Sequence, residues 1–207
     1  MKQIFGFVLA VLTLTLTLGA CSSSPVHYYT LVAPSDPGVA INEPVPFLLD
    51  ILPIGLPEQL DQPQLVVRQG VSGIVMADGE RWAGPLGDEL RQALSAELTS
   101  RLATRDIAGL IKPANKSVLR IKLLVRRLDF WPGQKLELEA DWNLAMVDAP
   151  GNTQRAQLFC HGSFHESAKG SYPELVQAGQ RAIAALAARI ATDARGQGLS
   201  PHSECAG

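Results

Sequence analysis

The side chains of this chain most able to bind a metal are Cys160, His161 and His165, which stand close together in the sequence. Histidines four residues apart can share a zinc ion when they lie on a helix. Here the surrounding residues alternate between apolar and polar, which predicts a strand, and residues four apart on a strand lie roughly 13 Å from each other. That is too far for one zinc ion. We therefore expect exposed histidines and no metal site.

Motifs of nucleophilic or phosphate chemistry do not occur either. The sequence has no GxSxG, no P-loop and no glycine-rich dinucleotide fingerprint, and no Ser-His-Asp set suggests itself. The paired acids Glu137 and Glu139 lie on a predicted strand face that arginines oppose, which is typical of surface pairing. We expect no enzyme and no cofactor. The near balance of 18 basic and 20 acidic residues also argues against nucleic-acid binding.

The N-terminus carries the clearest signal of destination. Lys2 precedes an apolar run over residues 4–18, which is shorter than the ~20 residues of a membrane span and fits a signal peptide. The run ends in Leu18-Gly19-Ala20-Cys21, which resembles the lipobox where a lipoprotein signal peptidase cuts before the cysteine. Residues 1–20 would be removed, and Cys21 would carry a diacylglycerol thioether and an N-acyl chain such as palmitate. An ordinary secretory signal with a chance cysteine is the alternative.

Lipidation at Cys21 would hold the protein on a membrane, because two acyl chains already give stable anchoring. Ser22 follows the cysteine, where aspartate would signal inner-membrane retention in enteric bacteria. This favours the outer membrane, with the domain facing the periplasm. We expect residues 21–26 to form a short lipidated tether and residues 27–207 a single domain. Seven residues from Cys21 to Tyr28 span roughly 25 Å at most, so the domain should lie near its membrane.

Cys160 and Cys205 are the two cysteines left after lipidation. A disulfide between them is plausible in an oxidising periplasm and would close a loop of about 45 residues, a constraint that the chain-entropy model rates at roughly 4 kcal/mol. The predicted strand pairing, however, buries Cys160 under the helices, where the C-terminal tail would have to tuck in. The sequence leaves the bonded and the unbonded form open.

Hydrophobic periodicity predicts an α+β fold, in which two long helices pack on one face of a largely antiparallel sheet. The leucines of the first helix recur every fourth residue, which favours a core stripe over a groove for a partner helix. Ser171 and Glu174 form a capping box before the second helix, and Asp78-Gly79 is a hairpin signal. The expected strands cover residues 27–32, 45–53, 64–69, 73–77, 118–129, 135–147 and 153–165, and the expected helices cover residues 85–102 and 172–195.

The last three strands have a predictable register. A hairpin centred on Pro132-Gly133 places Leu123 opposite Trp142 on the apolar face and Arg126 opposite Glu139 on the polar face. The polar face then becomes a lattice of opposite charges. The third strand brings Cys160 opposite Trp142 on the core face.

Two tryptophans stand beside turns. Trp82 precedes the first helix, and we interpret it as a core residue that fixes the helix start. Trp131 lies at the predicted hairpin tip, where a tryptophan is a good partner contact, because tryptophan is enriched at interface hot spots.

Three segments together resemble a known family: Tyr28-Tyr29-Thr30-Leu31, Arg81-Trp82-Ala83-Gly84-Pro85-Leu86 before the leucine-spaced helix, and the strand segment Ala140-Asp141-Trp142-Asn143-Leu144. In this order and spacing they are similar to the PqiC-like (YmbA-like) auxiliary lipoproteins of ABC-type transport systems. The resemblance covers nearly all of the chain after Cys21.

The resemblance implies an outer-membrane component of an MCE-type system that moves lipids between membranes. Its partner would be an MCE-domain periplasmic protein of the same system. Because MCE proteins assemble as rings, we expect a homo-oligomer, for which a ring is one arrangement. Two alternatives remain: a module that shields an acyl chain between sheet and helices, and an envelope assembly lipoprotein unrelated to transport.

Overall fold

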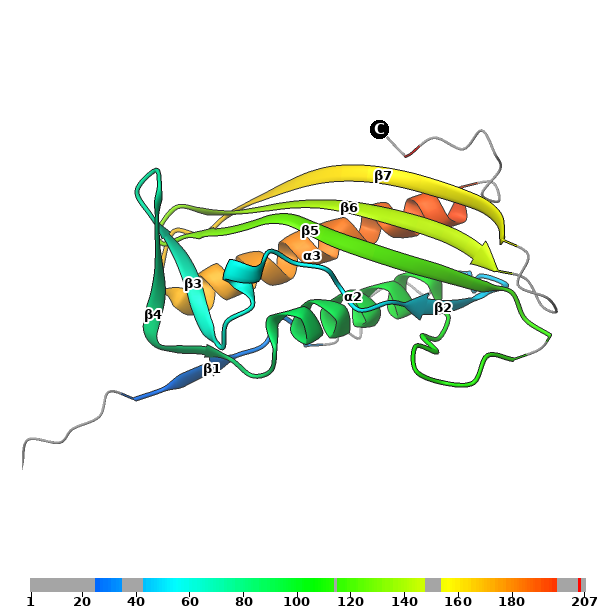
Figure 1. Cartoon of the computed structure of the whole chain (residues 1–207), viewed down its shortest axis with the longest axis horizontal. Coiled ribbons are helices and arrows are strands. Elements are labelled where there is room, and N and C mark those ends of the chain that lie inside the picture. Colours follow the sequence, from blue (N-terminus) through cyan, green and yellow to red (C-terminus); the bar gives the residue numbers. More distant parts are fainter. Residues whose placement is uncertain (1–24, 35–42, 114, 148–153, 197–204, 206–207) are drawn as a thin grey trace, which may run out of the picture.

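The structure is a computed structural model of the 207-residue chain, and it describes residues 25–34, 43–113, 115–147, 154–196 and 205. The strands and helices are labelled as in Figure 1. They are β1 (His27–Tyr29), β2 (Leu48–Ile51), a 3-10 turn (Glu58–Leu60), β3 (Gln64–Gln69), β4 (Gly73–Trp82), α2 (Leu86–Leu102), β5 (Val118–Trp131), β6 (Lys135–Val147), β7 (Gln154–Ser167) and α3 (Tyr172–Arg195).

The strands form two sheets. The larger has the order β2-β5-β6-β7, and the smaller has the order β1-β4-β3. The antiparallel meander β5-β6-β7 dominates, while β2 joins β5, and β1 joins β4, in parallel. Both helices lie on one face of the larger sheet (Figure 1). The predicted α+β class with two helices on one face is confirmed, although the strands do not make one sheet.

The predicted β5–β6 register is confirmed up to Val125 and wrong beyond it. Trp142 pairs with Leu123 on one side and with Cys160 on the other. Glu139, however, pairs with Arg127 and not with Arg126, because a β-bulge interrupts β5 between Val125 and Arg127.

The bulge is needed to keep the end of β5 in the core. The inward residues of β5 are odd-numbered up to Val125, but the next buried apolar residues are Leu128 and Phe130. One extra residue on the bulged strand restores the inward phase. The bulge lies at Arg126 and Arg127, and both of these side chains remain exposed.

The hairpin predicted at Asp78-Gly79 is also wrong. Both residues lie inside β4, and the chain reverses instead over residues 70–72, between β3 and β4. Gly79 has a φ of +77°, and a Cβ atom there would lie 2.9 Å from the carbonyl oxygen of Pro25. The glycine therefore permits a bend in β4 and a close approach of the N-terminal segment.

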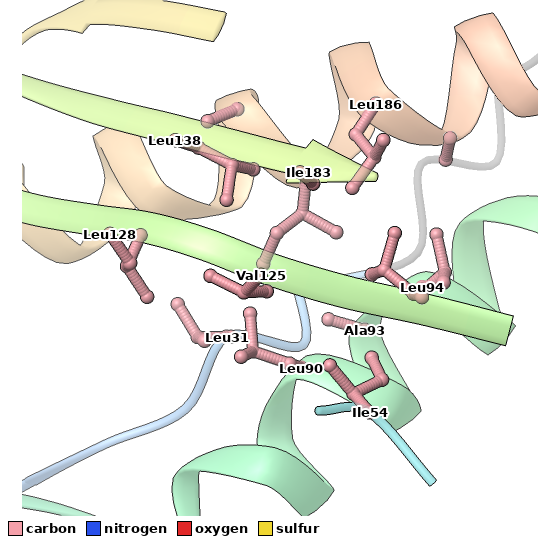
Figure 2. Close-up of a cluster of buried hydrophobic side chains, with 14 of the residues drawn as sticks. Leu31, Ile54, Leu90, Ala93, Leu94, Val125, Leu128, Leu138, Ile183 and Leu186 are labelled. Atoms are coloured by element: carbon pink, nitrogen blue, oxygen red, sulfur yellow. The ribbon is translucent and has the colours of Figure 1, made fainter. Parts of the chain in front are cut away.

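The helices meet the sheet through the apolar stripes that the sequence predicts. Figure 2 shows Leu90 and Leu94 of α2, and Ile183 and Leu186 of α3, facing Val125 of β5. All five leucines of α2 are buried, so the stripe is core and offers no groove to a partner helix. Trp82 is buried too, with its ring centroid 5.8 Å from that of Phe130.

The predicted capping box does not form. Ser171 is the N-cap residue of α3, but its side chain makes no capping hydrogen bond. The carboxylate of Glu174 instead lies against Gly170, in the space that a Cβ atom there would fill.

Neither α2, α3 nor any other helix in the part of the chain that the structure describes has the length and apolar character that crossing a membrane requires.

Candidate functional site

The predicted lipid-attachment residue Cys21, and the Leu18-Gly19-Ala20 motif before it, lie outside the described residues. The chain is described from Pro25 onward, so the site that can be built from the structure is the point where this N-terminal segment joins the fold. Any pull on an anchor at Cys21 would reach the domain through β1 and the residues after it.

Polar groups on three elements hold that segment, and we call them the N-terminal clamp: Glu89 of α2, Gln180 of α3 and the backbone of Ala83. The Glu89 carboxylate accepts hydrogen bonds from Thr30 Oγ1 at 2.7 Å and from the Leu31 backbone N–H at 2.9 Å. Gln180 Nε2 donates to the Thr30 carbonyl oxygen at 3.1 Å. The backbone N–H of Ala83 donates to the carbonyl oxygen of Tyr29 at 2.8 Å.

Below the clamp, the Leu31 side chain is buried in the core. It packs against α3 at Gly179, where a Cβ atom would lie 3.1 Å from Leu31 Cδ2. The strand predicted over residues 27–32 therefore ends at Tyr29, because Thr30 and Leu31 turn away from β4 to reach the helices.

The clamp also joins two of the three segments that carry the family resemblance. Tyr28 pairs with Arg81, and Tyr29 pairs with Trp82. These segments stand about fifty residues apart in the sequence, and the parallel β1–β4 pairing brings them side by side.

Buried charge surrounds the same strand pair. His27 Nδ1 lies 3.1 Å from Glu80 Oε1, and Glu80 is nearly inaccessible to solvent. Burial raises the pKa of Tyr29 to about 12, and a hydrogen bond with Glu80 and the negative charge of that carboxylate act in the same direction. Tyr29 therefore remains a neutral phenol at physiological pH.

The Glu89 contact is one that sequence reasoning did not find. Asp88 and Glu89 both suit the positive end of the helix dipole, and the sequence does not separate them. In the structure Asp88 is exposed and Glu89 is buried. The one usable signal is position, since Glu89 adjoins Leu90 on the buried face of α2 and Asp88 does not.

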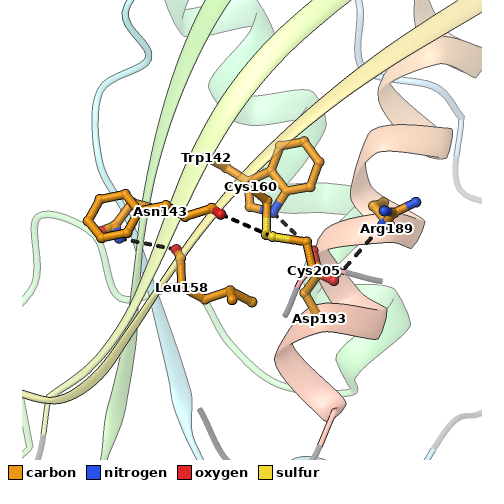
Figure 3. The surroundings of a disulfide bond; sticks show 8 residues. Trp142, Asn143, Leu158, Cys160, Arg189, Asp193 and Cys205 are labelled. Carbon is orange, nitrogen blue, oxygen red and sulfur yellow. Dashed lines mark hydrogen bonds and ion pairs between the residues drawn. A yellow bond between two sulfur atoms is a disulfide. The ribbon is translucent and has the colours of Figure 1, made fainter. Parts of the chain in front are cut away.

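The C-terminal region carries a second fixed point. Cys160 and Cys205 are joined by a disulfide, with their Cα atoms 5.7 Å apart (Figure 3). Cys160 is buried on the helix-facing side of β7, and Cys205 packs against the hydrophobic core from outside. The bond therefore ties the C-terminal segment at Cys205 to the middle of β7, an edge strand of the larger sheet.

Trp142 and Asp193 lie beside this disulfide. Trp142 Nε1 donates a buried hydrogen bond to Asp193 Oδ2 at 3.1 Å, and Arg189 Nε lies 3.9 Å from the other carboxylate oxygen (Figure 3). The bond satisfies an indole N–H that burial would otherwise leave unpaired. Asp193 was not predicted, because an aspartate near a helix end usually faces solvent.

The solvent face of the meander is a ladder of opposite charges. Arg126 Nε donates to Asp141 Oδ2 at 2.6 Å, and His161 Nδ1 lies 2.7 Å from Asp141 Oδ1. The hydrogen bond from His161, and then that from Arg126, lower the pKa of Asp141. His165 lies 3.8 Å from Glu137, so the two histidines face different acids.

The described residues contain no candidate metal-binding site. No three side chains among the histidines, cysteines and acids there come close enough together to hold a metal ion. His161 and His165 instead serve the charge ladder.

Trp131 is less exposed than its place beside the tip of the β5–β6 hairpin predicts. The ring is half-buried, with Lys135 Nζ 6.0 Å from its centroid. Its Nε1 atom is buried and has no hydrogen-bond partner among the described residues. Its role as a partner contact stays a prediction.

The fold and the clamp define an α+β domain that is fastened at its N-terminal end. The model of the ABC-type transport auxiliary lipoprotein component family matches residues 29–191, so the match begins at the clamp. This chain belongs to that family. It is therefore a membrane-anchored lipoprotein outside the cytoplasm and an auxiliary component of a transport system, in a family that is not enzymatic.

Solved structures share the fold at low sequence identity. One, described as an uncharacterized protein, is 19% identical with a TM-score of 0.62 and covers 83% of this chain and 99% of its own. Another, from Xanthomonas campestris, is 16% identical with a TM-score of 0.54 and covers 79% of this chain and 92% of its own. Identities this low establish the fold alone. No curated protein matches the chain.

We predict that Glu89→Ala destabilises the protein more than Asp88→Ala does. Both changes remove one acid from the first turn of α2, so their effects on the helix dipole are matched. Only the Glu89 change leaves the buried Leu31 N–H without an acceptor, at a cost of about 1–3 kcal/mol. Thermal unfolding measures the difference, and amide exchange at Leu31 should accelerate in Glu89→Ala alone. Equal losses in both variants would contradict the clamp.

We predict that the mature protein has no free thiol until it is reduced. In that case Cys205→Ser lowers the free energy of unfolding by up to about 4 kcal/mol, because it opens a loop of 45 residues. Thiol titration of unfolded protein, with and without reductant, tests the bond directly. Reductant should lower the melting temperature of the wild type and leave that of Cys205→Ser unchanged. Two thiols in unreduced protein would show that the bond is absent.

Proposed function

We propose that the protein is an outer-membrane-anchored, non-enzymatic component of an MCE-type intermembrane lipid transport system, and that it docks the periplasmic assembly to the outer membrane. The observation that carries the proposal is the family match, which starts at residue 29, shortly after the predicted lipid-attachment residue Cys21. Ser22 after that cysteine supports the outer membrane as the destination.

A docking role needs a rigid surface at some distance from the anchor, and the loop after α2 offers one. Leu110 and Ile111 are 68% and 97% exposed in the segment between α2 and β5. α2 is a 17-residue helix that leads away from the β1–β4 end, so this loop lies about 25 Å further along the molecule (Figure 1).

The loop is held on both sides of its exposed tip. The backbone N–H of Ile107 donates to the Leu49 carbonyl oxygen at 2.8 Å, and Lys112 Nζ lies 2.8 Å from Asp50 Oδ2. Asp50 is buried, yet the hydrogen bonds and charges of Lys112 and Arg120 outweigh burial and lower its pKa. A groove of about 540 Å³ adjoins the loop, and Phe47, Ile107 and Pro113 contribute apolar walls to it. The fixed Leu110–Ile111 pair fits an apolar contact on an MCE-domain protein.

The alternative in which the domain itself shields an acyl chain has less support. Side chains from both layers fill the space between the larger sheet and the helices, and most of them are almost wholly inaccessible to solvent. Ala178, Ala182 and Ala187 bring α3 close to the sheet, which leaves little room for a lipid tail. An envelope assembly lipoprotein unrelated to transport is the other alternative, and partner identity separates it from the proposal.

A homo-oligomer would match the symmetry of a ring-shaped partner and bind it multivalently. Phe159 supports this part of the proposal, because it is a large apolar residue, 72% exposed, on the edge strand β7.

Crosslinking in cells tests the proposed partner. We predict that a photo-reactive residue at position 111 crosslinks to the MCE-domain protein of the same system, and that the adduct fractionates with the outer membrane. Ile111→Asp should reduce recovery of that partner several-fold without changing the melting temperature, because the side chain is exposed. Trp131→Ala tests the second proposed contact, and it should weaken recovery of the partner without lowering the melting temperature. Adducts with unrelated envelope proteins only would contradict the transport role.

Light scattering tests the oligomer. We predict that the lipid-free domain, separated by size exclusion, has a mass above that of the monomer, and that Phe159→Asp returns it to one chain. A strict monomer at high concentration would count against self-association.

A further inference from the structure

We propose that the tip of the β3–β4 hairpin, defined here as residues 69–77, lies against the bilayer that carries the lipid anchor and forms a second contact with it. The inference rests on the proposed lipidation of Cys21. The contact is made by Val71 in the turn and by Ile74, Val75 and Met76 at the start of β4.

The hairpin tip exposes apolar side chains on both of its faces. Val71 is 97% exposed, and Ile74, Val75 and Met76 are 48%, 40% and 48% exposed. Successive residues of a strand point to opposite faces. Three partly exposed apolar residues in a row therefore show that neither face of the tip is fully covered within the described structure, although their partners Val66 and Val67 on β3 are buried.

The chemistry of the tip suits a lipid surface better than water. Residues 69–77 contain no lysine, arginine, aspartate or glutamate, and only Gln69 and Ser72 have polar side chains. Exposed strand edges in soluble proteins usually carry charges that block unwanted pairing. β3 is an edge strand, and β4 pairs with β1 only from Glu80 onward, yet neither strand carries a charge within the tip. Contiguous exposed apolar residues mark a contact with another protein or with a membrane.

Position selects the membrane. β4 runs parallel to β1, so the hairpin extends from the end at which the chain leaves toward Cys21 (Figure 1). Gly79 of β4 touches Pro25, and Met76 lies roughly 10 Å further along the strand. Four residues separate Pro25 from Cys21, a reach of roughly 14 Å at most. An anchor at Cys21 would thus hold the bilayer within reach of the hairpin tip.

The hairpin is braced for such a contact. Arg68, which directly precedes the tip and pairs with Ile74, donates from Nε to Asp129 Oδ1 at 2.8 Å and so ties β3 to the end of β5. The backbone groups of the turn at residues 70–72 need hydrogen-bonding partners, which the hydrocarbon interior does not supply. The tip should therefore rest at the boundary of headgroups and acyl chains, as shallow membrane-binding segments do.

Fluorescence in vesicles tests the contact. The full lipidated protein, as Val71→Cys or Ile111→Cys, is labelled under non-reducing conditions with an environment-sensitive dye and reconstituted in vesicles of phosphatidylethanolamine and phosphatidylglycerol. The two positions are equally exposed in the structure and lie at opposite ends of the domain. Unlabelled wild type reports background reaction of the native cysteines. The dye is then challenged with iodide in water or with doxyl groups on the lipid chains.

We expect the dye at position 71 to emit at shorter wavelength, to be quenched by the lipid-borne doxyl groups and to be several-fold less sensitive to iodide than the dye at position 111. Iodide sensitivity equal to that at position 111 overturns the contact. Protection from both quenchers also overturns it, because the tip would then be covered by protein, such as a second copy. Mass spectrometry of the N-terminal peptide tests separately whether Cys21 carries lipid. A chain without lipid at Cys21 overturns both the anchoring and the contact. A lipidated chain in which position 71 is exposed to water overturns the contact alone.

Discussion

Burial of one face of the β5–β6–β7 meander under α2 and α3 is the constraint on which the rest of this structure depends. Trp142 lies near the centre of that face, pairs with Leu123 and Cys160, and donates its indole N–H to Asp193 of α3. Because both helices cover the same face, the other face must remain in water. On that solvent face, the middle strand β6 carries acidic side chains, and its neighbours β5 and β7 carry arginines and histidines. Even the β-bulge in β5 follows from the constraint, since it returns Leu128 and Phe130 to the buried face.

The same core explains how the protein can be held by its N-terminus. Leu31 enters the core between the helices, and Glu89, Gln180 and Ala83 fix the backbone from Tyr29 to the N–H of Leu31. A force applied to a lipidated N-terminus would therefore meet buried hydrogen bonds and a packed side chain, and not a loose tail. The small β1-β4-β3 sheet adds a second connection, because Arg68 of β3 pairs with Asp129 of β5. Such a construction suits a lipoprotein that is held on its membrane by its N-terminus.

Apart from Phe159 on β7, the large exposed apolar residues of the described chain lie toward the two ends of the molecule. Val71 and Ile74–Met76 lie at the β1–β4 end, and Leu110 and Ile111 lie beyond the far end of α2. Under the proposed docking role, the first end would face the membrane and the second end would face the partner. The pairing of Lys112 with buried Asp50 fastens the loop after α2, which would lower the entropic cost of binding a partner there.

Sequence alone determined the features that depend on consecutive residues. The bounds of β3, β6 and α3, the buried stripes of both helices and the register around Trp142 follow from local periodicity and turn residues, and the order of three short motifs pointed to the family. Tertiary structure decided whatever depends on partners far along the chain. Glu89 and Asp193 became buried acceptors through Leu31 and Trp142, each more than fifty positions away. Asp78-Gly79 has the composition of a turn, yet the approach of Pro25 made it part of a bent strand. Periodicity shows which face of a helix or strand is apolar, but it does not show which distant residue will pack against that face. The packing of the core decides which residues come into contact there.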